Sequence, residues 1–139
     1  MRWLAVLLLI AVGGCSADVA TFSEQIDMQA RWNAENIYPD NYKVDLLAFM
    51  RTYLNNPEHV RDAQVSLPQI KRVGPGNRYV VCVRYNARNS DGRYMGDKDS
   101  AVIYSLGKLE HIIDQPKTAA ELCKDAAYAP FPELGTLTR

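Results

Sequence analysis

The sequence predicts a small α+β domain of two layers, in which a helix, a three-stranded antiparallel meander and a short C-terminal helix follow one another. Apolar residues recur every three or four positions between 42 and 54, and alternating or β-branched runs occupy 63–67, 78–85 and 100–106. A helix-capping pattern follows at Thr118. The chain has 139 residues, 47% of them hydrophobic and 23% charged, which suits one ordinary globular domain.

The first helix of this domain is predicted from about residue 42 to residue 54. Pro39-Asp40-Asn41 gives a start signal, because Asp or Asn can accept hydrogen bonds from the free N–H groups of the first turn. Asn55-Asn56-Pro57 ends the helix, since proline disfavours helical geometry in the residue before it. One face carries the apolar side chains, which we interpret as core: Tyr42, Leu46, Phe49, Met50, Tyr53 and Leu54.

The two later strands of the meander are predicted to form a hairpin. Asp91-Gly92 suits a two-residue turn of type I′. That turn would pair three sets of residues across the strands: Tyr79 with Tyr104, Val81 with Val102, and Arg84 with Asp99. Cys82 would then face away from Val81, so Cys123 would lie on the opposite face of the sheet. A bulge near Gly96 is an alternative that would change this register.

The C-terminal helix is predicted to begin at Thr118 and to run from Ala119 to about Ala126, with Glu121 completing a capping box. The tail that follows contains Pro130 and Pro132, so it cannot be helical throughout. We expect the tail to lie along the surface with Phe131 in an apolar groove.

The N-terminus resembles a secretory signal. Arg2 precedes ten apolar residues, Trp3 to Val12, which would be about 15 Å long as a helix, against roughly 30 Å for a bilayer. A charged start, a short apolar run and small residues before a cleavage point are typical of signal peptides. The alternative is a buried N-terminal helix, which the lack of a polar face and the two glycines that follow disfavour.

Val12-Gly13-Gly14-Cys15 resembles the lipobox of bacterial lipoproteins. The resemblance implies a signal peptide over 1–14, cleavage before Cys15, and a diacylglycerol on the Cys15 sulfur, usually with a third acyl chain on the new amino terminus. Ser16 after the cysteine favours the outer membrane over the inner one, by analogy with enterobacterial lipoproteins. Residues 15–38 would form a tether, partly helical around 24–33, that reaches about 25 Å as a coil. The folded domain would span 39–139.

The cysteines agree with an oxidising compartment. With Cys15 lipidated, Cys82 and Cys123 remain, and we expect them to form a disulfide. Two unpaired buried thiols are the main alternative. No ligand spacing indicates a metal site, and no Cys-x-x-Cys indicates a redox pair.

Sixteen Lys or Arg residues balance sixteen Asp or Glu residues, which disfavours a dedicated nucleic-acid binder. Between residues 61 and 98, however, the sequence has eight basic residues and only three acidic ones. One hypothesis is a basic surface for an anionic envelope polymer or an acidic partner, and the alternative is an ordinary solvated face. The candidate residues for that surface are Arg72, Arg78, Arg84, Arg88 and Arg93.

No nucleophile motif indicates catalysis, and neither a metal nor a cofactor is predicted. We therefore expect a non-catalytic binding or structural role in the cell envelope, on the periplasmic side. The partners would be the membrane, through the lipid, and an envelope protein or anionic polymer. The alternative is a small periplasmic hydrolase or ligand-binding enzyme that uses Glu110, His111 and Asp114. Those three residues also suit a solvated turn after the last strand.

Overall fold

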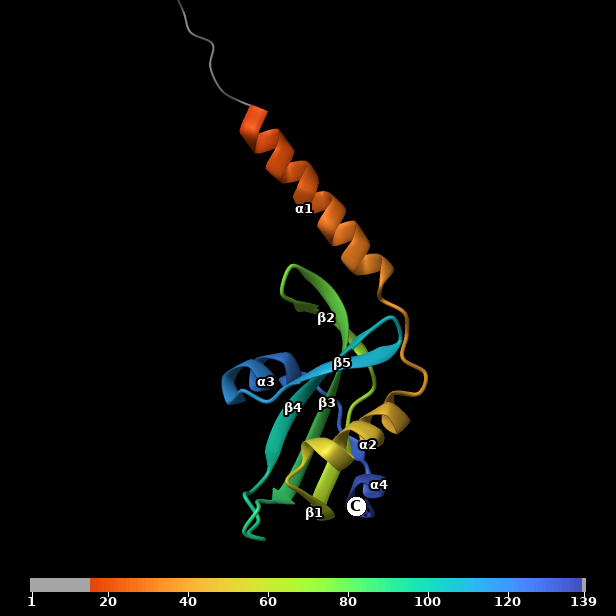
Figure 1. Cartoon of the computed structure of the whole chain (residues 1–139), viewed down its shortest axis with the longest axis vertical. Helices are drawn as coiled ribbons and strands as arrows, with labels where there is room; N and C mark the ends of the chain where they lie inside the picture. Colours follow the sequence, from red (N-terminus) through yellow and green to blue (C-terminus); the bar gives the residue numbers. More distant parts are fainter. Residues whose placement is uncertain (1–15, 139) are drawn as a thin grey trace, which may run out of the picture.

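A computed structural model describes residues 16–138, with side chains described from residue 21 onward. Within these residues four helices and six strands follow one another (Figure 1). In order they are α1 (Ser16–Ala34), α2 (Tyr42–Tyr53), β1 (Asn56–Val65), β2 (Gln69–Val73), β3 (Gly76–Arg88), β4 (Lys98–Ser105), β5 (Lys108–Ile113), α3 (Pro116–Cys123), β6 (Ala129–Pro130) and α4 (Pro132–Gly135). The predicted α+β class is confirmed. The three-stranded meander and the single C-terminal helix are only part of this larger arrangement.

The sheet is antiparallel, in the order β5-β4-β3-β1-β6, and β2 also pairs with β3. The long strand β3 pairs with two strands along the same edge. Its first half pairs with β2 and its second half with β1. Ser66 fills the break between β1 and β2, since its backbone N–H donates to Cys82 O at 2.8 Å and its Oγ accepts from Cys82 N–H at 2.9 Å. The edge of β3 therefore stays hydrogen-bonded where the partner strand changes.

The predicted register between β3 and β4 is confirmed: Tyr79 lies opposite Tyr104, Val81 opposite Val102, and Arg84 opposite Asp99. The cross-strand pairs of aromatic, aliphatic and oppositely charged side chains are therefore those that the sequence predicts.

The predicted type I′ turn is wrong, although the register it implied is right. Asp91 does not have the positive φ that this turn requires, whereas Gly92 has φ of 79° and donates to Asn89 O at 3.0 Å. The loop therefore contains three residues, 90–92. Near Gly96, with φ of 90°, one extra residue on the return strand then restores the register.

The two-layer prediction is also too simple, because helices cover both faces of the sheet. Strand residues alternate between the faces. On one face Val81, Val83 and Val102 pack with α2 and α4; on the other face Cys82, Ala101 and Ile103 pack with α3. The disulfide between Cys82 and Cys123 joins β3 to α3 on this second face, with a Cα–Cα distance of 5.7 Å. Cys123 thus lies on the face of the sheet opposite Val81, as the predicted pairing of the strands implies.

The predicted capping box at Thr118 is wrong, because α3 begins earlier, at Pro116 after Gln115, and has no side-chain cap. Proline suits the first turn of a helix, where its missing N–H would have no partner. The expectation for Phe131 is confirmed: its side chain is fully buried, beside Leu134 of the short helix α4.

The tether predicted after Cys15, with partial helix around 24–33, is helical over the longer range of α1, whose 19 residues extend for about 28 Å. It projects from one end of the domain, and the hairpin between β3 and β4 lies at the other end (Figure 1). Phe22, Ile26 and Met28 are at least half exposed, so α1 packs on the domain only near its C-terminal end. Among residues 16–138 no helix is both long and apolar enough to cross a membrane.

Candidate functional site

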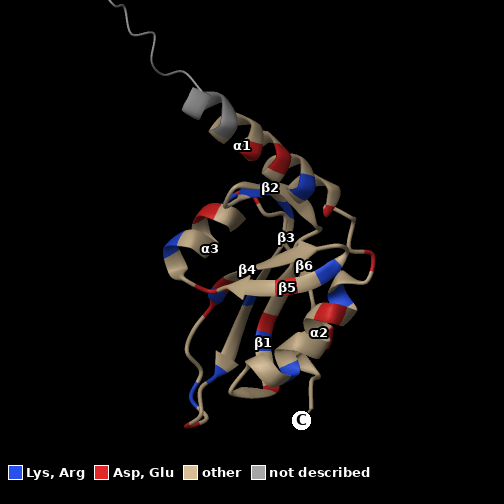
Figure 2. Ribbon diagram, turned by 45° about the horizontal axis from the view of Figure 1, so that its top comes forward, with Lys and Arg blue, Asp and Glu red and all other residues tan. Residues whose placement is uncertain are grey.

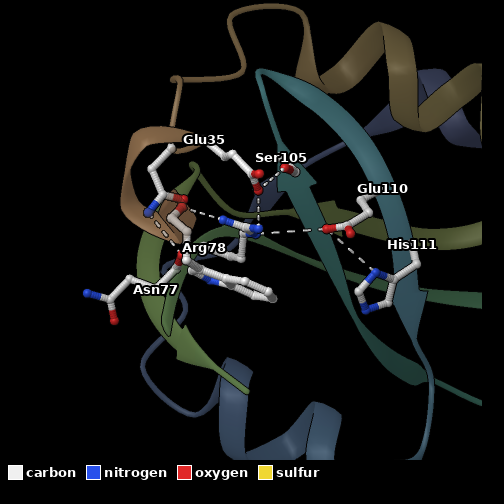
Figure 3. Close-up of polar contacts among 8 residues, drawn as sticks. Glu35, Asn77, Arg78, Ser105, Glu110 and His111 are labelled. Atoms are coloured by element: carbon white, nitrogen blue, oxygen red, sulfur yellow. Dashed lines mark hydrogen bonds and ion pairs between the residues drawn. The ribbon is translucent and has the colours of Figure 1, made fainter. Parts of the chain in front are cut away.

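Arg78 fixes the end of α1 to the sheet. Its side chain is buried, and its guanidinium stacks on the Trp32 ring at 3.6 Å from the ring centre (Figure 3). The guanidinium also donates to Trp32 O at 2.6 Å and to Glu35 Oε2 at 2.5 Å, and Glu110 lies 3.9 Å away. A cation that is stacked and hydrogen-bonded in this way holds its partners in one geometry.

Two turns of the sheet complete the attachment. Asn36 Nδ2 donates to Asn77 O at 2.9 Å, and Leu106 N–H donates to Glu35 O at 2.7 Å. Gly76 lies beneath the indole, and a methyl group there would be 2.3 Å from Trp32 Cδ1. We call Trp32, Glu35, Asn36, Asn77 and Arg78 the Arg78 cluster. It attaches the segment from residue 32 to residue 36 to the sheet.

The predicted basic surface does not form as a unit. Arg78 is buried in the cluster just described, and Arg84 makes two hydrogen bonds to Asp99, at 2.6 and 3.0 Å, while stacking on Tyr128. Neither offers a free positive charge to a partner. Tertiary contacts, which the charge count ignores, pair both charges with a carboxylate.

The other three candidate arginines do not lie together on one surface. Arg72 is exposed on β2 beside α1, whereas Arg93 is exposed in the β3–β4 hairpin at the opposite end of the domain (Figure 2). Arg88 is half-buried at the end of β3, where it lies near Tyr94. Basic residues therefore occur at both ends of the domain, interspersed with acidic ones.

Glu110, His111 and Asp114 do not form one constellation. Glu110 lies between Arg78 and His111, 3.9 Å from each (Figure 3). Asp114 instead accepts hydrogen bonds from Tyr53 of α2, at 2.5 Å, and from Lys98 of β4, at 3.3 Å. The alternative enzyme hypothesis, which needs the three side chains together, therefore gains no support from their positions. Within residues 16–138, no three His, Cys, Asp or Glu side chains are grouped to hold a metal.

A cleft of about 470 Å³ lies where α2 ends against the β3–β4 hairpin, and Asp114 is at its wall. This volume is within the range of small-molecule sites. Its lining combines apolar and aromatic side chains with a few polar ones: Tyr53, Leu54, Asn55, Tyr85, Ala87, Arg88, Asn89, Met95, Gly96, Lys98 and Asp114. We call it the Tyr53 cleft.

The polar groups of the Tyr53 cleft keep one carboxylate ionised. The hydrogen bond from Tyr53, followed by that from Lys98, lowers the pKa of Asp114 below its ordinary value. Burial and the bond to Asp114 raise the pKa of Tyr53, so its hydroxyl stays protonated and donates. Burial also raises the pKa of Tyr85. The cleft therefore presents a fixed anion beside an ammonium and neutral phenols, an arrangement that suits binding by hydrogen bonds.

No protein-family model, curated protein or solved structure matches this chain. Support for both candidate sites therefore comes from their geometry in this structure.

Replacing Tyr53 with phenylalanine is expected to raise the pKa of Asp114 toward its ordinary value of about 4. In the native protein Asp114 adds stability above its unfolded-state pKa, and this stability is lost as the pH falls through the lower folded-state pKa. The Tyr53→Phe variant should lose less stability between those two pH values. A carboxyl-detected NMR titration measures the pKa directly.

The matched control is Tyr128→Phe, because Tyr128 donates to a different carboxylate, Asp99, at 3.2 Å. This control should leave the pKa of Asp114 unchanged. An Asp114 pKa that is the same in Tyr53→Phe and in the native protein would contradict the expected role of Tyr53.

The sequence did not reveal either the Arg78 cluster or the Tyr53 cleft. Arg78 and Glu35 are 43 residues apart, and Tyr53 and Asp114 are 61 apart, so no local pattern links them. Trp32 and the Gly74-Pro75-Gly76 turn were the nearest signals. The predicted lipidation site, Cys15, lies outside the described residues.

Proposed function

We propose that this chain is a lipid-anchored, periplasm-facing protein of the cell envelope with a non-catalytic binding or structural role. One observation carries the proposal: Ser16, which follows the lipobox-like Val12-Gly13-Gly14-Cys15 in the sequence, belongs to the helix α1, and the C-terminal end of α1 is held on the domain by the Arg78 cluster. A lipid on Cys15 would thus connect to the domain through a helix, and a helix of this length separates the two by up to about 28 Å.

The physical consequence is a domain held in a limited range of positions near a membrane. Each buried methylene of an acyl chain contributes about 0.8 kcal/mol, so two or three chains anchor a protein stably. The end of α2 and the β3–β4 hairpin, which line the Tyr53 cleft, lie away from α1 (Figure 1). This part of the domain would face away from the membrane, toward an envelope protein or an anionic envelope polymer, and Ser16 favours the outer membrane over the inner one.

The test is the mass and the partitioning of the protein made in a Gram-negative host. The native chain should begin at Cys15, carry two or three acyl chains and enter the detergent phase. The Cys15→Ala variant should lack the acyl chains and remain in the aqueous phase or keep its signal peptide. Ser16→Asp is the matched control, because it changes the neighbouring residue and keeps the acylated sulfur. A native product that retains Met1, or one that begins at Cys15 without lipid, would overturn the proposal.

A further inference from the structure

Two arginines meet at one tyrosine ring near the far end of the domain. The Arg61 guanidinium stacks over the Tyr94 ring at 3.8 Å from the ring centre, and the Arg88 guanidinium lies 5.9 Å from the same centre. Tyr94 is held in place because its hydroxyl donates to His59 O at 2.8 Å. The ring thus brings two positive charges from β1 and β3 to one place.

No carboxylate balances these charges. Among the side chains described, those of residues 21–138, no Asp or Glu oxygen lies within 4.0 Å of Arg61 or Arg88, in contrast to Arg78 and Arg84. Arg88 donates only weakly to Glu58 O, at 3.3 Å, and its Nε is buried without a hydrogen-bond partner in the described part of the chain. A buried donor without a partner is costly, and two guanidinium groups close together repel each other. An anion bound beside the Tyr94 ring would balance the two positive charges.

The backbone of β1 is distorted on both sides of Arg61. His59 and Asp62 have φ of 58° and 54°, in the left-handed region that non-glycine residues rarely adopt. The pairing of β1 with β3 shifts register before and after Arg61. Such bulges redirect side chains, and strained residues of this kind gather at binding sites. Here they turn the Arg61 side chain toward Tyr94 of the hairpin.

A depression of about 480 Å³ lies over this pair, lined by His59, Val60, Arg61, Arg88, Tyr94 and Gly135. We propose that it binds an oxyanion, a carboxylate or a phosphate, on a ligand of the cell envelope. An arginine stacked on an aromatic ring keeps its N–H edge free, and that edge matches the two oxygens of such a group. This inference adds a ligand class to the proposed function. It rests on the proposed function only in taking the ligand from the cell envelope.

The test is a titration followed by the arginine Nε–Hε NMR signals of the processed, detergent-solubilised protein. The probes are N-acetyl-D-alanyl-D-alanine, its C-terminal amide and inorganic phosphate, each at millimolar concentration. We expect the signals of Arg61 and Arg88 to shift with an anion and not with the amide. A response to the peptide assigns a carboxylate source, and a response to phosphate alone assigns a phosphate source.

Four variants give the test its contrast. Arg61→Ala and Arg88→Ala should each weaken anion binding about tenfold, as the loss of one charge-assisted hydrogen bond does. Arg61→Lys keeps the charge and the fold but loses the stacked fork, and should weaken binding less. Arg93→Ala, at an exposed arginine of the same hairpin, should bind like the native protein. Absence of any shift with both anions, or equal binding in Arg61→Ala and Arg93→Ala, would overturn the inference. Because the same titration can be repeated on the unlipidated Cys15→Ala variant, its failure is distinct from an unlipidated Cys15.

Discussion

Replacing both Cys82 and Cys123 with alanine is expected to lower the free energy of unfolding by about 2–5 kcal/mol. The disulfide joins residues 41 apart in the chain, so its loss greatly enlarges the set of conformations open to the unfolded chain. The folded state also depends on it locally. Helix α3 has only eight residues, too few to be stable alone, and it covers the second face of the sheet.

Urea unfolding, followed by circular dichroism, measures this loss. Dithiothreitol should destabilise the native protein by a similar amount and leave the Cys82→Ala/Cys123→Ala variant unchanged, because that variant has no disulfide to reduce. Equal midpoints for the native protein and the variant would show that the disulfide does not support α3 as proposed.

Replacing Gly76 with alanine is expected to displace Trp32 and release the end of α1. The added methyl would lie 2.3 Å from Trp32 Cδ1 and 2.7 Å from Cγ, closer than carbon atoms approach, so the indole must move. Arg78 then loses its stacking surface. We expect a cost of about 1–3 kcal/mol, as for other overpacked sites. Of the two tryptophans in the sequence, only Trp32 lies after the predicted cleavage point, so its fluorescence in the processed protein reports this change directly.

Gly74→Ala is the matched control in the same turn. Gly74 has φ of 62°, and a methyl there meets no atom within 4 Å. Its replacement should cost about 1 kcal/mol through backbone strain while leaving the emission of Trp32 unchanged. The emission of Gly76→Ala should shift to longer wavelength, as expected for an indole exposed to water. Identical emission from both variants would contradict the attachment of α1 through Trp32.

The sequence predicted best where contacts are repetitive. The alternation in 78–85 and 100–106, with turn residues between them, was enough to pair Tyr79 with Tyr104 and to place Cys82 away from Val81. The alternation was enough because a shift of the strand pairing by one residue would move every apolar side chain to the wrong face of the sheet. The turn itself was mispredicted, since a three-residue loop and a bulge near Gly96 together give the same register as a two-residue turn.

The sequence predicted least where an element lacks a buried periodic face. The segment of α1 was expected to be only partly helical because its few apolar residues form no core stripe. In the structure Phe22, Ile26 and Met28 are at least half exposed, so packing adds no periodic pattern there. Strands β2 and β5 were missed because much of each is exposed at the edges of the sheet, so neither shows a clear alternation of buried residues. The count of basic residues likewise could not show that Arg78 is buried while Arg61 and Arg88 lack a carboxylate partner.

Local pattern was sufficient to establish the α+β class, the central hairpin and the two faces of β3, because these follow from the order of apolar and polar residues over a few positions. The signal-like N-terminus is local in the same sense. The Arg78 cluster, the Tyr53 cleft and the depression over Arg61 and Arg88 each depend on a contact between residues 33 to 61 positions apart, which meet only when the sheet forms. Charge and hydrogen bonding act through space rather than along the chain, so only the folded structure decides which arginines are neutralised and which can bind a ligand.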